Sequence, residues 1–259
     1  MDLGINGRSA IVCASSRGLG RGCAMALAEA GCNLVINGRD PDPLKRTAEE
    51  IRDRFGVQVA EVAADVSTAD GRKALLAASP EPDILINNNA GPPLRDFRTL
   101  SRDDILRGVE QNMVTPLELI QAAVDGMVRR GFGRIVNITS LSVYMPMFGL
   151  DLSSGARAGL TSFLAGVARQ VAASNVTINN LLPGKFETDR LRDNIRVGAE
   201  KAGVSIVDRA RQQAAEIPAR RFGTPQEFGR TCAFLCSVHA GYITGQNIRL
   251  DGGLFPSAF

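Results

Sequence analysis

A glycine-rich turn between a short apolar run and an alanine-rich segment constrains the fold of this sequence more than any other feature. The apolar run is Ala10-Ile11-Val12, the turn ends at Gly20, and a helix is expected from about Arg21 to Ala30, where Gly31 can end it. Such a turn lets backbone N–H groups approach a pyrophosphate, whose charge the helix N-terminus stabilises. The sequence therefore predicts the dinucleotide-binding corner of an α/β sheet, rather than a tight turn without a ligand.

Short apolar runs alternate with longer amphipathic segments along most of the 259 residues. This alternation is typical of βαβ units, in which helices cover both faces of a parallel sheet. We therefore predict an α/β protein with a Rossmann-type, doubly wound, seven-stranded parallel sheet, formed by a single domain over residues 1–259. The predicted strands are Ala10–Cys13, Leu34–Asn37, Val57–Val62, Ile84–Asn87, Arg134–Ile138, Thr177–Leu182 and Asn247–Leu250.

Capping residues mark the ends of several predicted helices. Asp42 is expected as an N-cap with Pro43 in the first helical position, and Gly56 closes that helix. Thr224-Pro225-Gln226-Glu227 is a capping box that begins another helix. Residues 184–218 contain no predicted strand and are expected to form one or two helices. An excursion of this length is often a lid or a binding loop.

Charge and hydropathy argue against several kinds of partner. The 30 basic and 27 acidic residues give a net charge of +3 that is spread along the chain, so neither nucleic acid nor a membrane surface is expected as a partner. The N-terminus Met1-Asp2-Leu3-Gly4 lacks a leader pattern, and no apolar run approaches the roughly 20 residues that span a bilayer. The odd number of cysteines fits reduced thiols. We therefore expect a soluble, cytoplasmic protein.

Three potential zinc ligands fall on one face of a predicted helix. Cys232, Cys236 and His239 are spaced at i, i+4 and i+7, which places them together. The favoured interpretation is a buried helix face, because small buried cysteines are common. No metal is predicted.

A series of ordered motifs follows the glycine turn. They are Asp65-Val66, Asn87-Asn88-Asn89-Ala90-Gly91, Ile135 to Ser140, Asn179 through Pro183-Gly184 to Thr188, and Ile243 to Gln246 before Leu250-Asp251-Gly252-Gly253. With these motifs the chain resembles the short-chain dehydrogenase/reductase family, particularly its β-ketoacyl carrier-protein reductase-like members, over essentially its whole length. The turn of that family is Thr-Gly-x-x-x-Gly-x-Gly, so Gly18 and Gly20 match, whereas Cys13 and Ala14 depart from it.

The resemblance implies a nicotinamide cofactor and, as in most of the family, a homotetramer supported by residues near Asp251. Counting from Asn112 puts Ala90, rather than Gly91, at the family's glycine position. The implied cofactor-binding residues are Ser15, Ser16, Arg17, Gly18, Leu19, Gly20, Arg39, Asp65, Val66, Asn88, Asn89, Ala90, Arg157, Pro183, Gly184 and Thr188.

Charge at the end of the second predicted strand favours NADP(H) over NAD(H). An acidic residue there would bind a free ribose 2′-hydroxyl, whereas a 2′-phosphate requires cations. The chain has Asn37-Gly38-Arg39 at this place, and Arg17 in the turn. Arginine offers phosphate a planar set of donors, although either side chain taken alone could be an ordinary surface charge.

The family's catalytic residues are only partly present. The resemblance implies that Asn112 holds a proton-relay water and that Ser140 orients the substrate oxygen. The family's Tyr-x-x-x-Lys-Ala-Gly-Leu aligns with Ser153 through Leu160, so Ser153 replaces the tyrosine and Arg157 replaces the lysine. A serine hydroxyl cannot supply a proton as a phenol with a pKa near about 10 can, and arginine stays charged. Arg157 can still bind the nicotinamide ribose.

Two other residues are candidates for the missing acid. Tyr144 lies four residues after Ser140, and Lys185 follows the Pro183-Gly184 turn. Tyr144 could equally be a wall of the pocket, because it stands in an apolar run. For Lys185, a role as a surface or phosphate-binding cation is favoured.

We therefore expect an NADP(H)-dependent reductase of a small or acyl-linked carbonyl compound, with an altered catalytic set and a carbonyl compound or the corresponding alcohol as its substrate. The apolar run from Met145 to Leu150 and the excursion at 184–218 indicate a largely apolar substrate pocket. The alternative is a catalytically silent nucleotide-binding protein, acting as a sensor or structural partner. Non-redox, dehalogenase-like catalysis is disfavoured, because those relatives keep the tyrosine and lose the nucleotide site.

Overall fold

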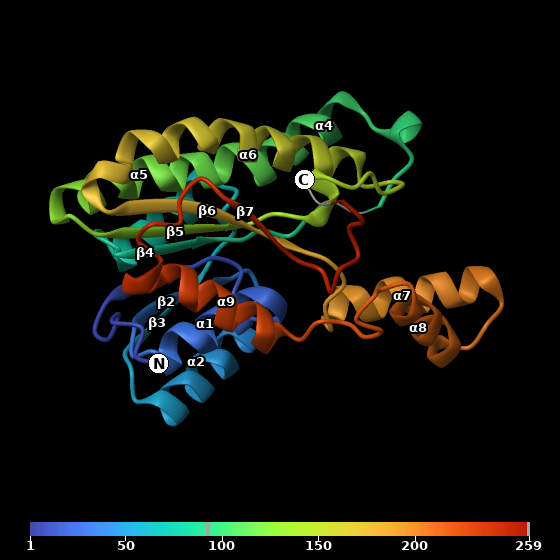
Figure 1. The fold of residues 1–259 in the computed structure, drawn as a ribbon, viewed down its shortest axis with the longest axis horizontal. Helices are drawn as coiled ribbons and strands as arrows, with labels where there is room; N and C mark the ends of the chain where they lie inside the picture. The colour runs from blue at the N-terminus through green and yellow to red at the C-terminus, as the bar shows by residue number, and fades with distance from the viewer. Residues whose placement is uncertain (92–93, 258–259) are drawn as a thin grey trace.

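The computed structural model describes residues 1–91 and 94–257, and its centre is a sheet of seven parallel strands (Figure 1). The strand order is β3-β2-β1-β4-β5-β6-β7, with the change of direction between β1 and β4. This arrangement confirms the predicted fold class. The strands are β1 Ser9–Val12, β2 Asn33–Gly38, β3 Val59–Ala63, β4 Ile84–Asn87, β5 Gly133–Ile138, β6 Val176–Pro183 and β7 Asn247–Leu250.

Helices cover both faces of the sheet because apolar residues alternate in direction along each strand. Val12 and Ile36 pack on one face with α1 Gly18–Glu29, α2 Pro41–Phe55 and α9 Pro225–Cys236. Ile11 and Val35 pack on the other face with α3 Ala69–Ala78, α5 Thr115–Arg130 and α6 Asp151–Val171. Figure 1 shows α5 and α6 above the sheet and α1, α2 and α9 below it. A further helix, α4 Arg102–Val109, precedes α5.

Helices α1 and α9 cross in backbone contact. A Cβ atom on Gly229 would collide with the carbonyl oxygen of Gly22, so the crossing requires glycine. Cys232 and Cys236 are fully buried at this crossing, which confirms the buried helix face. The His239 ring contacts the backbone oxygen of Asp2 over 2.8 Å. Among the described residues, no three potential metal ligands lie close enough together to hold an ion.

Three predicted starts were wrong by two or more residues, and helix α2 explains one of them. The sequence contains two Asp-Pro pairs, and the structure uses the first: Asp40 is the N-cap, its side chain accepts from Asp42 N over 3.2 Å, and Pro41 begins the helix. Helix α1 begins at Gly18 rather than Arg21, because the helix continues directly from the turn, and β3 begins at Val59 rather than Val57.

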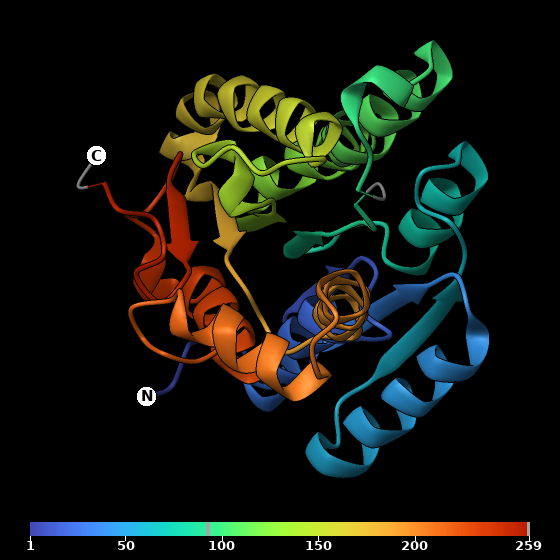
Figure 2. The ribbon, with the colours of Figure 1, turned by 90° about the vertical axis from the view of Figure 1, so that its right-hand side faces the viewer.

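The end of α2 and the start of α9 were predicted correctly. Gly56 has a left-handed φ of 66° and closes α2, and Thr224 with Glu227 forms the capping box of α9. Residues 184–218 hold α7 Asp189–Ala202 and α8 Ile206–Ala215. These two helices project away from the sheet (Figures 1 and 2).

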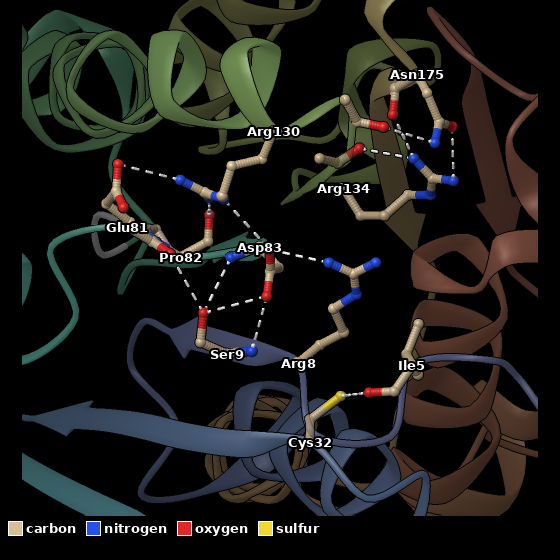
Figure 3. Close-up of polar contacts among 12 residues, drawn as sticks. Ile5, Arg8, Ser9, Cys32, Glu81, Pro82, Asp83, Arg130, Arg134 and Asn175 are labelled. Carbon is tan, nitrogen blue, oxygen red and sulfur yellow. Dashed lines mark hydrogen bonds and ion pairs between the residues drawn. The ribbon is translucent and has the colours of Figure 1, made fainter.

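The amino-terminal edge of the sheet is cross-linked by charged groups (Figure 3). The carboxylate of Asp83 lies 3.4 Å from Arg8 and 3.6 Å from Arg130. Arg134 is 1% exposed, and all three of its guanidinium nitrogens donate hydrogen bonds. The opposite, carboxyl-terminal edge is free to carry a binding site. Nowhere in residues 1–91 and 94–257 does a helix have the length and apolar character that crossing a bilayer requires.

Candidate functional site

The glycine-rich turn that follows β1 is tied to the ends of β2 and β4. Ala14 adopts a left-handed φ of 45°, and its N–H donates to Asn37 Oδ1 over 3.2 Å. Asn88 Nδ2 donates to the carbonyl oxygen of Ala14 over 3.2 Å. A Cβ atom on Gly20 would collide with that same carbonyl, so only glycine fits there. The turn is therefore held in one conformation.

The two serines of the turn have different surroundings. Ser15 is fully buried, and its hydroxyl donates to Val12 O over 2.7 Å, so its side chain belongs to the support of the turn. The backbone oxygen of Ser16 accepts from Thr47 Oγ1 over 3.1 Å, which links the turn to α2. Ser16 itself is partly exposed.

Helix α1 begins with free backbone donors. Its N-cap, Arg17, makes no side-chain capping bond, which is also true of α5 and α6. Helices α2, α3, α4, α7, α8 and α9 are each capped by a side-chain oxygen. The N–H groups of the first turn and the helix dipole together favour an anion. The Thr188 methyl carbon would lie 3.5 Å from a Cβ atom on Gly18, so the segment after β6 reaches the same place. These residues fit a phosphate group.

Charged side chains gather at the ends of β2 and β3. Arg17 forms an exposed ion pair with Asp40 at 3.1 Å. Arg39, which precedes Asp40 in the sequence, is also exposed. Asp65 accepts from the N–H and the hydroxyl of Ser67. Burial alone would raise the pKa of Asp65, but the Ser67 bonds and the charge of Arg39 hold it below its usual range. Arg39 therefore lies near enough to Asp65 to influence its charge, and both residues stay predicted cofactor ligands.

Ser140 lies two residues after β5 and is the N-cap of a short helical turn, η3 Leu141–Val143. Its Oγ accepts from Ser142 N over 3.1 Å and lies 2.9 Å from the Ser142 hydroxyl. The Ser140 side chain is thus fixed at the carboxyl-terminal edge of the sheet, where ligands bind in open α/β sheets.

Asn112 lies in a π-helical segment, η2 Glu110–Val114, which joins α4 to α5. Such segments are frequent at functional sites. The side chain is 2% exposed, and its Nδ2 donates to Gly108 O over 3.0 Å. Its Oδ1 is buried without a hydrogen-bond partner in the part of the chain that the structure describes.

Ser153 and Arg157 lie one turn apart on the buried face of α6. They are 4% and 7% exposed. Arg157 Nε donates to Ser153 Oγ over 3.2 Å, and its Nη1 donates to Ile138 O over 2.7 Å. Burial, and then repulsion from Arg190, lowers the pKa of Arg157 to about 10. Arg157 therefore joins α6 to the end of β5, two residues before Ser140.

One cavity brings the two groups of predicted residues together. Val66, Asn88 and Asn89, predicted to bind cofactor, line it together with Asn112 and Arg157. The Asn89 side chain bends back, accepting from Ala90 N over 2.8 Å.

The turn after β6 packs against the end of β7. Gly184 N donates to Leu250 O over 2.9 Å, and a Cβ atom on Gly184 would lie 2.8 Å from Asp251 Cα. This close approach holds Pro183 and Gly184 in position and directs the chain toward Thr188.

The two candidate stand-in acids are bonded elsewhere. Tyr144 is 42% exposed, its hydroxyl oxygen accepts from Asn247 Nδ2 over 2.9 Å, and its ring lies 5.8 Å from that of Phe255. Lys185 pairs with Glu216 at 2.7 Å. Neither residue lines the cavity that contains Arg157.

Several residues of this region were not predicted as site residues, among them Arg190, Asn87 and Thr115. Arg190 influences Arg157, and a Cβ atom on Gly91 would lie 2.7 Å from its Nη1. Asn87 and Thr115 line the cavity and have buried atoms without partners among the described residues. Arg190 follows Thr188 closely enough to have been a candidate, whereas Thr115 carries no sequence signal.

Comparison with known proteins gives the family. A family model described as enoyl-(acyl carrier protein) reductase matches residues 13–255. The 3-oxoacyl-[acyl-carrier-protein] reductase FabG of Aquifex aeolicus is 31% identical over 259 residues, covering 98% of this chain and 100% of the relative. The chain belongs to the short-chain dehydrogenase/reductase family. This confirms the resemblance that the motifs carry.

Other members of the short-chain dehydrogenase/reductase family agree in sequence and fold. The NADPH-dependent reductase BacG of Bacillus subtilis is 31% identical, covering 96% of this chain and 98% of the relative. The structure of L-sorbose reductase from Gluconobacter frateurii, complexed with NADPH and L-sorbose, matches with a TM-score of 0.94 at 28% identity, covering 99% of this chain and 100% of that one. The replacement of a catalytic tyrosine and lysine by Ser153 and Arg157 stays a prediction.

Proposed function

We propose that this chain is an NADP(H)-dependent reductase of a small or acyl-linked carbonyl compound that works with an altered catalytic set. The observation that carries the proposal is the uncapped N-terminus of α1 in a glycine turn, beside the cavity lined by Asn112 and Arg157. Relatives named as a 3-oxoacyl carrier-protein reductase, an NADPH-dependent reductase and an L-sorbose reductase support it. Five free, buried cysteines are consistent with a reducing, cytoplasmic setting.

The residues of the turn are assigned to the cofactor's phosphates. The pyrophosphate would accept from the N–H groups of the first turn of α1, beside Ser16, with Ser15 supporting the turn. Arg17 and Arg39 would bind the 2′-phosphate, and Arg17 would exchange its exposed pairing with Asp40 for it. The remaining contacts are assigned to Leu19, Asp65, Val66, Asn88, Asn89, Ala90, Pro183, Gly184 and Thr188.

The bound nicotinamide would supply a hydride to the carbonyl carbon. Ser140, fixed at the end of β5, would donate to the carbonyl oxygen. Because Ser153 Oγ accepts from Arg157, its own O–H is left to point at the same oxygen, and the Arg157 charge stabilises negative charge developing there. The proton that the alkoxide takes would come from water by way of the Ser153 hydroxyl, which is a far weaker acid than a phenol. Without a phenol we expect turnover slower by about 10²- to 10⁴-fold than with one.

The substrate is expected to be largely apolar beyond its carbonyl group. Phe148 and Tyr144 are exposed in the loop after β5, and helices α7 and α8 expose Val197, Ile206 and Val207. Exposed apolar side chains on both segments fit a lid that closes over an apolar ligand. The excursion at 184–218 is therefore proposed as the lid.

The second candidate is a catalytically silent nucleotide-binding protein. It is favoured by the hydrogen bonds and ion pair that hold Tyr144 and Lys185 away from the cavity. Following NADPH absorbance with aldehydes, diketones and β-ketoacyl thioesters separates the two. Consumption that depends on substrate supports the reductase, and NADPH binding without consumption of any substrate supports the silent protein.

A restored active site provides the matched comparison. We expect the double variant Ser153→Tyr with Arg157→Lys to turn over the best substrate at least about tenfold faster, because it regains a phenolic acid. An unchanged or lower rate with cofactor binding intact would show that Ser153 and Arg157 are not replacements for those two residues.

A further inference from the structure

Four asparagine side chains form a continuous row of hydrogen bonds across the sheet. Asn87, Asn137, Asn180 and Asn247 occupy paired positions on β4, β5, β6 and β7. Each Nδ2 donates to the Oδ1 of the next residue, over 2.9 Å, 3.0 Å and 2.8 Å. The last, Asn247, donates to the hydroxyl oxygen of Tyr144. We call these four residues the asparagine ladder.

Backbone carbonyl groups fix the direction of the asparagine ladder. Asn87 Nδ2 also lies 3.5 Å from Pro116 O, and Asn137 Nδ2 lies 3.4 Å from Asn179 O. Only an N–H group can donate to these oxygens, so the amides point the same way along the row. Hydrogen bonds in such a chain polarise one another, and their dipoles add. The negative end of the row is Asn87 Oδ1.

The residue at this negative end, Asn87, lines the cavity of the candidate site. Asn87 Oδ1, Asn112 Oδ1 and Thr115 Oγ1 are all buried and, within the described residues, have no hydrogen-bond partner. All three residues line the cavity that Arg157 also lines. Unpaired buried polar atoms are rare and destabilising. Three of them around one cavity indicate that they serve a charge held there.

The charge is that of the Arg157 guanidinium, which has few direct hydrogen-bond partners. Its Nε and Nη1 donate to one hydroxyl and one carbonyl oxygen, and no carboxylate within residues 1–91 and 94–257 forms an ion pair with it. The buried Arg134, in contrast, uses all three nitrogens (Figure 3). A buried guanidinium requires negative potential in its surroundings.

We propose that the asparagine ladder is a positioning device for Arg157: it holds the Asn87 carbonyl toward the cavity, where that oxygen and Asn112 Oδ1 replace a carboxylate counter-charge. Amide dipoles stabilise the guanidinium without forming a tight ion pair that would compete for its remaining donors. Arg190 is the charged group that opposes this effect, since it lowers the pKa of Arg157. The inference concerns the folded chain itself and does not depend on the proposed function.

A double-mutant cycle on unfolding tests the proposal. Asn137→Ala cuts the asparagine ladder at a residue that also lines the cavity, and it keeps Asn87, Asn112 and Thr115. Arg157→Met removes the charge and keeps a long side chain. We expect Asn137→Ala to raise the unfolding equilibrium constant at pH 7 about tenfold more with Arg157 than with Met at 157, equivalent to one pKa unit of support for the charge. Urea unfolding without cofactor, at matched oligomeric state, is the measurement.

Asn179→Ala is the matched control, because its buried amide bonds Ile243 O and Gln246 N outside the asparagine ladder. Asn179→Ala should raise the unfolding equilibrium constant by the same factor with Arg157 and with Met at 157. Asn180→Ala is the second cut, at a residue of the asparagine ladder that does not line the cavity, and it should behave as Asn137→Ala does. The proposal would be overturned if a cut in the asparagine ladder raised the unfolding equilibrium constant by the same factor, within about twofold, with Arg157 and with Met at 157. NADPH affinity of the native chain is measured separately, so loss of the proposed function would not be confused with failure of the cycle.

Discussion

Ala14 is the residue whose backbone the fold strains most visibly within the candidate site. Its φ of 45° lies in the left-handed region, which glycine enters without steric cost. Hydrogen bonds from its N–H to Asn37 and to its carbonyl from Asn88 hold it there. The strain is therefore imposed by the same contacts that shape the turn for a ligand.

Ala14→Gly should stabilise the chain. We expect the free energy of unfolding to rise by about 0.5–1 kcal/mol, because relief of the left-handed strain exceeds the extra entropy of an unfolded glycine. Urea denaturation measures this. Ala122→Gly, at an exposed position inside α5, is the control and should lose about 0.5–1 kcal/mol. A loss of stability in Ala14→Gly as large as the control's would contradict the account.

Arg39→Ala tests the preference for NADPH. We expect its affinity for NADPH to fall about tenfold and its affinity for NADH to stay within about twofold, because only NADPH carries the 2′-phosphate. Arg129→Ala, an exposed arginine beside Glu81, is the matched loss of charge and should change neither affinity. Equal loss of both cofactors in Arg39→Ala would remove Arg39 from the 2′-phosphate site.

The partners of these residues could not be predicted as well as the residues themselves. Glycine spacing and strand order identify the turn, because they express local backbone requirements. The pairing of Arg17 with Asp40, and of Tyr144 with Asn247, depends on where separate elements meet in space. Such contacts leave no periodic signal in the sequence.

At the scale of elements, caps explain both a correct and a wrong boundary. Thr224 and Glu227 form a reciprocal capping box, a pattern with one possible register, so the start of α9 was predicted. Asp40-Pro41 and Asp42-Pro43 offer two equivalent starts for α2, and local propensity does not choose between them. Strand β6, Val176–Pro183, extends the predicted Thr177–Leu182 by one residue at each end.

Glu227→Gln should make the stability of α9 less dependent on pH. The Arg221 side chain, and then the N–H of Thr224, lower the pKa of Glu227 from 4.5 to about 2. A carboxyl group whose pKa is lowered by folding stabilises the fold at pH values above its ordinary pKa. This stabilisation is lost as the pH falls through the pKa of the folded state. The native chain should therefore exceed Glu227→Gln in thermal midpoint at about pH 6, with the difference vanishing between pH 4.5 and about 2. Because the Arg221–Glu227 pair is exposed, about 1 M salt should also reduce this difference in thermal midpoint. A difference that depends on neither pH nor salt would contradict the assignment.

At the scale of the whole molecule, the amino-terminal and carboxyl-terminal edges of the sheet have different roles. Asp83, Arg8 and Arg130 cross-link the amino-terminal edge, and the cavity with Arg157 lies at the carboxyl-terminal edge. This division follows from the parallel order, which brings all strand ends of one kind together. The sequence predicted a parallel, doubly wound sheet, whereas the asparagine ladder emerges only once the registers of four strands are known.

Assembly is the second property at this scale, and we propose a homotetramer. The outer face of α6 exposes small residues around Phe163, which is 52% exposed. We expect light scattering to give the mass of four chains, and Phe163→Glu to reduce it, because a buried charge opposes helix packing between copies. The control is Gln212→Glu, which adds the same charge at an exposed position of α8 and should leave the mass unchanged. A monomer in the native chain would contradict the proposal.

The central claim is that the turn between β1 and α1 binds NADP(H), and titration with NADPH tests it most directly. Fluorescence of the reduced nicotinamide can be followed cleanly because the chain contains no tryptophan. We predict a saturable change in emission that excess NADP⁺ reverses, together with a rise in thermal midpoint. No change in emission and no thermal shift would contradict the account.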